Sequence, residues 1–178
     1  MWDELAIETQ VLDVAIQLVP APLPQATALA RRPAVYLIFY DGDLAWLRTP
    51  GYPVYVGSAA DGAERLCRHR SNAKPVANLR RGDDLSVVIV PMPSHAASLY
   101  AERLLIDRLR PVWTEPWLGG FGSRHQGATR TSQAPAPWNL LHPGRRTGTG
   151  EPTVSVALLK RRVIAHLAAT VMHGLWRS

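Results

Sequence analysis

The chain contains little cysteine, no long apolar run and few acidic residues toward its end. Its 178 residues include a single cysteine, Cys67, which excludes an internal disulfide and a zinc site built from cysteines. No apolar stretch approaches the length needed to span a bilayer, and the chain starts with acidic residues where a signal peptide would be basic. We therefore expect a cytoplasmic protein without membrane contact.

Histidine and glycine patterns exclude two further kinds of site. His125 and His142 lack the spacing of a zinc site. The glycines at 119, 120 and 122 are not followed by the Lys and Ser or Thr of a phosphate-binding loop. We therefore expect no nucleotide cofactor.

The acidic residues are missing mainly from the last third of the chain. Residues 1–116 carry 12 Lys and Arg against 13 Asp and Glu, whereas residues 117–178 carry eight against Glu151 alone, and the net charge is +6. A second basic stretch without an acid runs from 65 to 81. Most of these cations are Arg, whose planar fork suits phosphates and guanine edges. The pattern favours double-stranded DNA as partner, and a solvated basic face is the alternative.

The hydrophobic pattern predicts one small α/β domain with arms. Hydrophobic residues make up 47% of the chain, enough for a packed core. Periodicity and punctuation predict strands at 35–40, 53–57 and 85–90, and helices at 3–18, 62–79, 95–109 and 153–176. This order indicates a mixed three-stranded sheet flanked by helices. We divide the chain into an N-terminal helix with a Pro-rich connector (1–30), a core (31–116), a basic Gly/Pro-rich arm (117–152) and a C-terminal amphipathic helix (153–178).

Four short motifs follow one another in the core. Val35-Tyr36-Leu37 and Tyr55-Val56-Gly57 lie on expected strands, Arg65 follows on the next helix, and Glu102 lies on a later one. In this order they resemble the motifs of the GIY-YIG nuclease superfamily. The resemblance implies the GIY-YIG fold and endonuclease activity on DNA.

The end of the chain resembles one branch of that superfamily. Gly120-Phe121-Gly122 and residues 137–145 are similar to the C-terminal arm of GIY-YIG restriction enzymes that cut CCGCGG. This likeness implies a type II restriction endonuclease that cuts a short palindrome as a homodimer. The chain departs from these relatives at Thr114, where they commonly have Asn, and in a short segment before Arg65.

The resemblance implies metal-dependent hydrolysis with Glu102 as the metal ligand. A carboxylate is a hard oxygen ligand suited to Mg²⁺, which keeps most of its waters, and we expect Mn²⁺ to substitute. The alternative is an exposed helix carboxylate paired with Arg103 or Arg108.

Arg65 and His69 lie four positions apart and therefore share one helix face. Arg65 can clamp the scissile phosphate, and His69 can contact the same phosphate or relay a proton. The alternative is a general basic face that includes Arg68 and Arg70.

The tyrosines of the two strand motifs are the remaining catalytic candidates. The resemblance implies that Tyr36 acts as general base or orients the attacking water, and Tyr55 is the second catalytic tyrosine that we expect. The choice between Tyr36 and His69 as the base stays open. Ordinary aromatic packing is the alternative for both tyrosines, and packing is the role that we expect for Tyr40.

We expect further basic and polar side chains to contact DNA. These are Arg68, Arg70, Lys74, Arg124, Arg130, Asn139, His142, Arg145 and Arg146. Which of them read bases is left open.

Two other functions and two roles for the last helix remain open. A structure-specific or mobile-element nuclease would share the core but usually carries a separate module, for which this chain offers no segment. A catalytically silent DNA-binding protein would not need the set of Tyr36, Tyr55, Arg65 and Glu102. The apolar stripe from Val156 to Leu175 either packs on its own sheet or forms a dimer contact.

Overall fold

The structure, a computed structural model, describes residues 21–22, 32–42, 44–61, 85–118, 134–135, 137–141 and 150–173. The helices expected at 3–18 and 62–79 lie outside these residues, as does most of the arm expected at 117–152.

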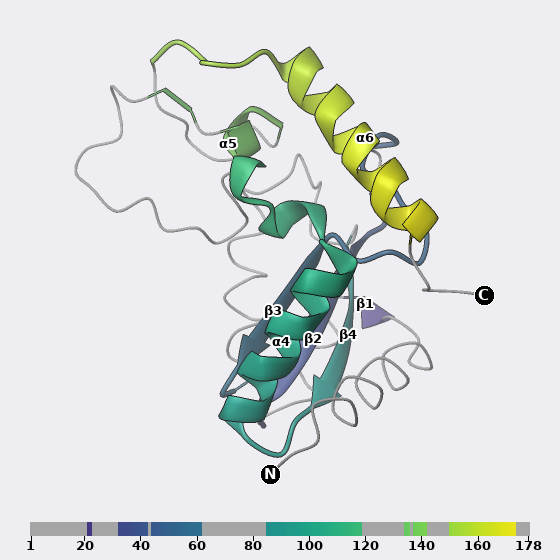
Figure 1. The fold of residues 1–178 in the computed structure, drawn as a ribbon, viewed down its shortest axis with the longest axis vertical. Helices are drawn as coiled ribbons and strands as arrows, with labels where there is room; N and C mark the ends of the chain where they lie inside the picture. The colour runs from purple at the N-terminus through teal and green to yellow at the C-terminus, as the bar shows by residue number, and fades with distance from the viewer. Residues whose placement is uncertain are drawn as a thin grey trace.

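The centre of the fold is an antiparallel sheet (Figure 1). Its three main strands are β2 (Ala34–Tyr40), β3 (Tyr55–Ala59) and β4 (Leu85–Pro91), and the two-residue strand β1 (Ala21–Pro22) pairs with β4. The spatial order is β1-β4-β2-β3, so β2 is central and β3 lies at an edge. All described pairs are antiparallel, so the sheet itself is not of mixed direction.

Each main strand lies close to its predicted position. Strand β3 begins two residues later than predicted, because Pro53 has no N–H for the ladder and stands before the first pair, Ile38 with Tyr55. Strand β2 is buried along its whole length, as expected for a central strand rich in β-branched and aromatic residues.

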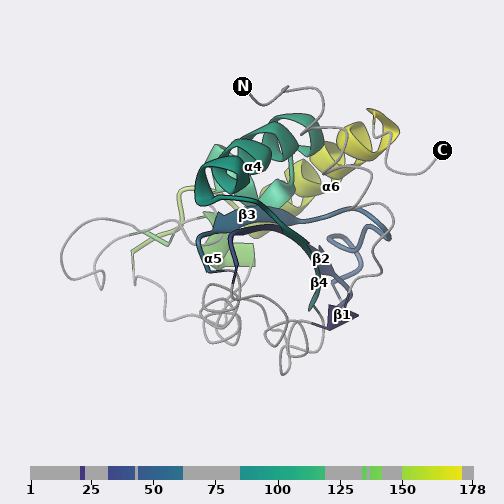
Figure 2. The same cartoon turned by 90° about the horizontal axis from the view of Figure 1, so that it is seen from below.

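Alternation along β2 divides the core into two clusters on opposite faces of the sheet. Val35, Leu37 and Phe39 pack in the cluster that includes the buried residues of helix α4 (His95–Leu109). Tyr36 and Ile38 pack in the other cluster, with residues from the chain that follows α4. The two faces therefore have different covers, and Figure 2 shows α4 lying over one of them.

Helix α4 has the bounds that the sequence predicts, because both of its ends are capped. The Ser94 side chain accepts a hydrogen bond from the backbone N–H of Ala97 at 3.1 Å, which satisfies an otherwise unpaired donor of the first turn. At the other end Arg110 adopts a left-handed conformation with φ 46°, and its N–H donates to Ile106 O. Pro111 follows and cannot continue the helix.

Short helical elements carry the chain from α4 to the second long helix. These are η1 (Val112–Thr114), η2 (Pro116–Leu118) and α5 (Pro137–Leu141), followed by α6 (Val156–His173). Trp113, Leu118 and Trp138 from this region are buried in the cluster that contains Tyr36. Parts of the segment expected to be an arm therefore belong to the core.

Helix α6 packs on its own chain through part of the predicted apolar stripe. Leu159, Val163 and Leu167 are buried in the Tyr36 cluster, whereas Val156 and Val171 are exposed. Leu175 lies outside the described residues. No helix within the described ranges combines the length and apolarity needed to cross a membrane.

Candidate active site

Tyr36 and Tyr55 lie side by side on neighbouring strands. Tyr36 is fully buried and Tyr55 nearly so. Their ring centroids are 6.2 Å apart with a tilt of 38°, a separation typical of interacting aromatic pairs. The two tyrosines of the strand motifs are therefore brought together, on the face of the sheet opposite α4.

Gly57 creates the space in which the end of the Tyr36 side chain lies. It is the register partner of Tyr36 in the β2–β3 pair. A Cβ atom at position 57 would stand 2.5 Å from the Tyr36 hydroxyl oxygen, 2.7 Å from its Cζ and 2.8 Å from Cε1 of Tyr55. Real Cβ atoms do not approach neighbours this closely, so both rings depend on a glycine here.

Glu102 reaches the same strand from helix α4. It lies near the middle of the helix and is half-buried. Its Oε2 accepts a hydrogen bond from the Ser58 hydroxyl on β3. Because side chains alternate along a strand, Ser58 lies on the α4 face while Gly57 lies on the tyrosine face.

The Tyr36 hydroxyl and the Glu102 carboxylate therefore approach two consecutive residues of β3, Gly57 and Ser58, from opposite faces of the sheet. Strand β3 is an edge strand; Glu102 is half-buried on one side of it, and Tyr36 is fully buried on the other.

Most of the other predicted site residues lie outside the described residues. These are Arg65, Arg68, His69, Arg70, Lys74, Arg124, Arg130, His142, Arg145 and Arg146. Asn139 belongs to α5, but its side chain is also outside the description.

The donor set at this edge fits a hard divalent cation. Glu102 offers carboxylate oxygens at a half-buried position, held by Ser58. Mg²⁺ accepts one or two carboxylates, with waters and substrate phosphates completing its octahedron. Among the residues that the structure describes, no three His, Cys, Asp or Glu side chains gather as metal ligands. Of the described side chains, Glu102 is the one that the motif order assigns to the metal.

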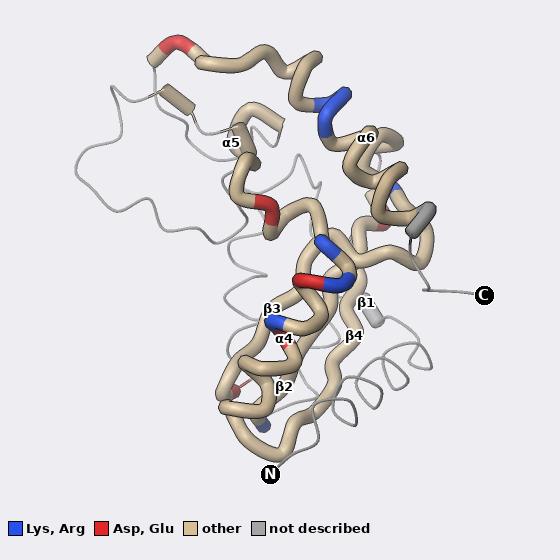
Figure 3. The backbone as a smooth tube through the Cα atoms, in the orientation of Figure 1, with Lys and Arg blue, Asp and Glu red and all other residues tan. Residues whose placement is uncertain are grey.

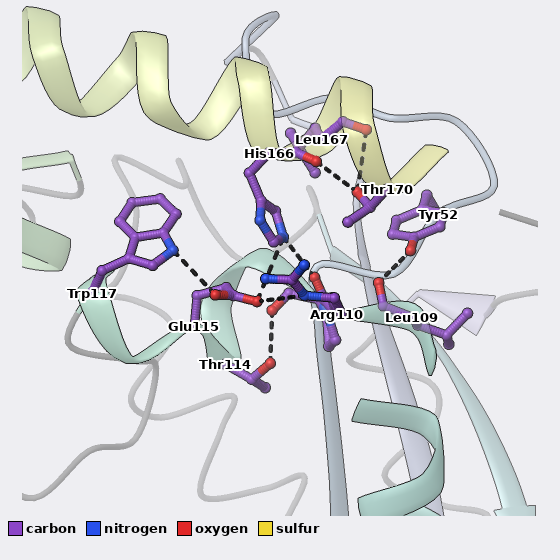
Figure 4. A network of polar contacts seen from close by, with 10 residues as sticks. Tyr52, Leu109, Arg110, Thr114, Glu115, Trp117, His166, Leu167 and Thr170 are labelled. Atoms are coloured by element: carbon purple, nitrogen blue, oxygen red, sulfur yellow. Dashed lines mark hydrogen bonds and ion pairs between the residues drawn. The ribbon is translucent and has the colours of Figure 1, made fainter. Parts of the chain in front are cut away.

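The carboxy-terminal end of α4 carries a second polar cluster, joined to α6 (Figure 4). The carbonyl oxygen of Arg110 lies 2.7 Å from Nε2 of His166. Glu115 contacts both of these residues, with Oε1 3.4 Å from Arg110 Nε and 3.9 Å from His166 Nε2. The Tyr52 hydroxyl donates to the carbonyl of Leu109. Carbonyls that the helix leaves without intrahelical donors are thus satisfied by side chains from elsewhere in the chain.

Burial raises the pKa of the Tyr52 hydroxyl above its usual range, while a hydrogen bond with Thr170 and the charge of Arg110 act in the opposite direction. The hydroxyl is therefore held neutral as a donor.

Thr114, at the position where the resembling enzymes commonly have Asn, lies in this second cluster. Its hydroxyl donates to the carbonyl of Pro111 at 2.7 Å, within the turn η1. The side chain therefore serves its own backbone, as threonine hydroxyls commonly do in turns.

Lys and Arg residues occur on α4 and α6 (Figure 3), and Arg103, Arg108, Lys160 and Arg162 are among the exposed ones. On α6, Arg162 stacks over the Trp117 ring with Cζ 4.3 Å from its centroid, and Lys160 Nζ lies 5.7 Å from that of Trp46. Arg161 lies between them and is exposed. None of the three was among the expected DNA contacts.

Sequence reasoning also missed Ser58 and the cluster around Glu115. A signal for Ser58 was available, because a serine that directly follows Tyr-x-Gly on a mostly buried strand points to the opposite face and needs a partner there. The contacts of Glu115 and His166 join residues distant in sequence, which no periodic pattern reveals.

A comparison with protein families relates the chain to known proteins. Residues 53–167 match the family described as the Eco29kI GIY-YIG domain, whose restriction endonucleases cut CCGCGG. The match includes Tyr55, Arg65 and Glu102 and begins after Tyr36. No curated protein matches the chain significantly. Because the family match covers more than half of the 178 residues, the chain belongs to the Eco29kI family of GIY-YIG restriction endonucleases, which carry out type II restriction cleavage of DNA.

Proposed function

We propose that this enzyme hydrolyses phosphodiester bonds of double-stranded DNA at a short palindromic site, using Mg²⁺ held by Glu102. The observation that carries the proposal is the approach of the Tyr36 hydroxyl and the Glu102 carboxylate to adjacent residues of an edge strand. A deprotonated water and a neutralised phosphate are the two requirements of the reaction. A proton acceptor and a metal-binding carboxylate at one edge are suited to supply both.

Each side chain has a separate role in this proposal. A bound Mg²⁺ supplies positive charge to the phosphate and lowers the pKa of a water molecule. Arg65 clamps the scissile phosphate, and Tyr36 orients the attacking water or accepts its proton. His69 is the alternative base, and Tyr55 packs against Tyr36 at 6.2 Å between centroids and keeps its ring in place.

The remaining predicted contacts serve DNA binding. Arg68, Arg70 and Lys74 from the core, and the cationic and polar residues of the segment 117–152, are proposed to bind the backbone or the grooves. Phosphate contacts of this kind supply affinity and its salt dependence.

Glu102→Gln tests the metal ligand. The amide keeps the shape of the side chain but loses the negative charge, so cleavage of plasmid with Mg²⁺ should be abolished while DNA binding in Ca²⁺ stays near that of the parent. Glu151→Gln is the matched control, because Glu151 is an exposed glutamate outside the described secondary structure elements. Substantial Mg²⁺-dependent cutting by Glu102→Gln would remove Glu102 from the mechanism.

Tyr36→Phe tests the hydroxyl separately from the ring. The ring packing is retained, so the protein should fold and bind DNA but lose most of its cleavage activity. Normal cutting by this variant would show that Tyr36 only packs. Sequencing the ends of discrete fragments made by the parent enzyme would identify the target and the cut position.

We further propose that the enzyme acts as a homodimer. One active site hydrolyses one strand, and a two-fold dimer matches the symmetry of a palindrome. Helix α6 offers exposed apolar side chains, Leu158, Ile164 and Val171, beside the stripe that it buries in its own core.

Light scattering with and without an oligonucleotide that contains the identified target would measure the assembly. Two subunits per duplex are expected. A single subunit per duplex that nevertheless makes concerted double-strand breaks contradicts the dimer.

A further inference from the structure

The Ser58 hydroxyl is the feature of this edge that no motif assigns to a role. It donates a hydrogen bond to Oε2 of Glu102, across 44 positions of sequence. The bond connects the edge strand β3 to the middle of α4. Within the described residues, Ser58 is the hydrogen-bond partner of this carboxylate.

Geometry makes this bond more than a surface contact. A glutamate side chain has several rotatable bonds, and fixing them costs on the order of 1–2 kcal/mol of conformational entropy. A hydrogen bond to a charged acceptor is about twice as strong as a neutral one. Ser58 is itself half-buried, and its neighbours on the strand, Gly57 and Ala59, are buried. The backbone at Ser58 is therefore held in place, and the position of its hydroxyl relative to the carboxylate is restricted.

The remaining acceptor capacity is what a metal would use. A carboxylate has about four lone-pair directions on two oxygens, and the bond from Ser58 takes one of them on Oε2. Among the residues that the structure describes, no other group takes a lone pair of this carboxylate. A serine hydroxyl that donates to Glu102 can also accept a hydrogen bond from a water.

We propose that Ser58 is a positioning residue that pre-orients Glu102 for the divalent cation, so that metal binding does not have to order the side chain. The inference rests on the proposed role of Glu102 as metal ligand. Partners of metal ligands that do not touch the metal typically contribute about 10–100-fold to metal affinity. Loss of the hydroxyl should therefore lower the affinity for the metal more than it lowers the stability of the fold.

The test compares Ser58→Ala with Ser58→Thr in the full chain. Mn²⁺ binding is followed by the loss of the free-ion electron paramagnetic resonance signal, and plasmid cleavage is measured across a Mg²⁺ titration. Ser58→Ala should weaken Mn²⁺ binding about tenfold or more and raise by a similar factor the Mg²⁺ concentration for half-maximal rate. Ser58→Thr keeps the hydroxyl on a residue that strands favour and should restore both values.

Ser86→Ala is the matched control. Ser86 lies on β4 of the same sheet and its hydroxyl also donates to a carboxylate, Oδ2 of Asp41 at 2.6 Å, but at an exposed position. Its loss should leave Mn²⁺ binding and the Mg²⁺ titration unchanged. Thermal unfolding of all three variants should stay close to that of the parent.

The outcomes separate this inference from the proposed function. If Ser58→Ala binds Mn²⁺ and depends on Mg²⁺ as the parent does, while Glu102→Gln is inactive, the positioning role of Ser58 is overturned and the metal site is retained. Failure of a folded Ser58→Thr variant to recover would likewise overturn it, because the hydroxyl would then not be the operative group. If Glu102→Gln binds Mn²⁺ and cuts like the parent, the proposed metal site itself fails.

Discussion

Helix α4 carries two polar clusters that differ in how their groups are partnered. At the middle of the helix, the Glu102 carboxylate receives a hydrogen bond from Ser58 at an edge strand. At the carboxy-terminal end, Glu115 is contacted by Arg110, His166 and Trp117, with the Trp117 indole N–H donating to it at 3.1 Å. Among the described residues, Ser58 is the hydrogen-bond partner of Glu102, whereas the polar groups of the second cluster join α4 to α6.

This difference separates a binding role from a structural role on chemical grounds. Both clusters contain a glutamate beside exposed arginines, so residue type alone does not distinguish them. The number of contacts that the described residues make with each carboxylate does distinguish them. Glu115 already accepts a hydrogen bond from the Trp117 indole and lies close to Arg110 and His166. Such a carboxylate is costly to recruit for a metal, because a lost hydrogen bond leaves a partly buried polar group unsatisfied.

Gly57→Ala should produce the largest effect, at the strand position that precedes Ser58 and contacts Tyr36 and Tyr55. The new Cβ would lie within 3 Å of Tyr36 and Tyr55, so one ring must move and the free energy of unfolding should fall by about 2–3 kcal/mol. Cleavage should be lost even at temperatures where the variant is folded. Denaturant unfolding and plasmid cleavage measure the two effects.

The double variant that combines Tyr36→Phe with Gly57→Ala sharpens this result. Removing the hydroxyl removes the nearest of the colliding atoms, so the Gly57→Ala change should cost less when Tyr36→Phe is already present than it does in the parent. Equal costs in both backgrounds would show that the Tyr36 hydroxyl is not what Gly57 accommodates.

His166→Ala should have a smaller effect, confined to stability. The Arg110 carbonyl loses its partner at 2.7 Å, so unfolding should become easier by about 1 kcal/mol while cleavage and metal dependence stay unchanged. His95→Ala, an exposed histidine in the first turn of α4, is the control and should change neither property. A loss of cleavage by folded His166→Ala would contradict the division of α4 into two clusters.

The smallest effect concerns pH and Tyr52. Because burial raises the pKa of Tyr52 above the usual 10.0, the folded state holds this proton more tightly than the unfolded state. The resulting stability is fully present below pH 10 and is lost as pH rises through the higher value of the folded state. The free energy of unfolding, measured with urea, should therefore fall more steeply above pH 10 for the parent than for Tyr52→Phe.

Tyr100→Phe is the control for this comparison, since Tyr100 is a half-buried tyrosine of α4. Its pH dependence should follow that of the parent. If the free energy of unfolding falls equally steeply with pH in the parent and in Tyr52→Phe, Tyr52 has the same pKa in the folded and unfolded states.

The sequence predicts the elements of the core well because their signals are local. The Ser94 cap and Pro111 define α4 from one segment of chain, and the run of β-branched and aromatic residues defines β2. The motif order selected Tyr36 and Glu102, and the family match confirms the kind of enzyme.

What the sequence could not predict depends on contacts between distant segments. The Ser58–Glu102 bond and the cap of Arg110 by His166 join residues 44 and 56 positions apart. The apolar stripe of α6 is another case, because its period shows that it is amphipathic but not which partner covers it. The structure places Leu159, Val163 and Leu167 against the chain's own core.

The short strand β1 has a consequence for aggregation. It covers the outer rim of β4 at Val87 and Ser86, which pair with Ala21 and Pro22. A two-residue strand that ends in proline offers almost no ladder to an incoming chain, because proline has no N–H to donate. Strand addition is therefore hindered at Val87 and Ser86, where β1 occupies the rim of β4, and this pairing should lower the tendency of concentrated solutions to form fibrils seeded from that part of β4.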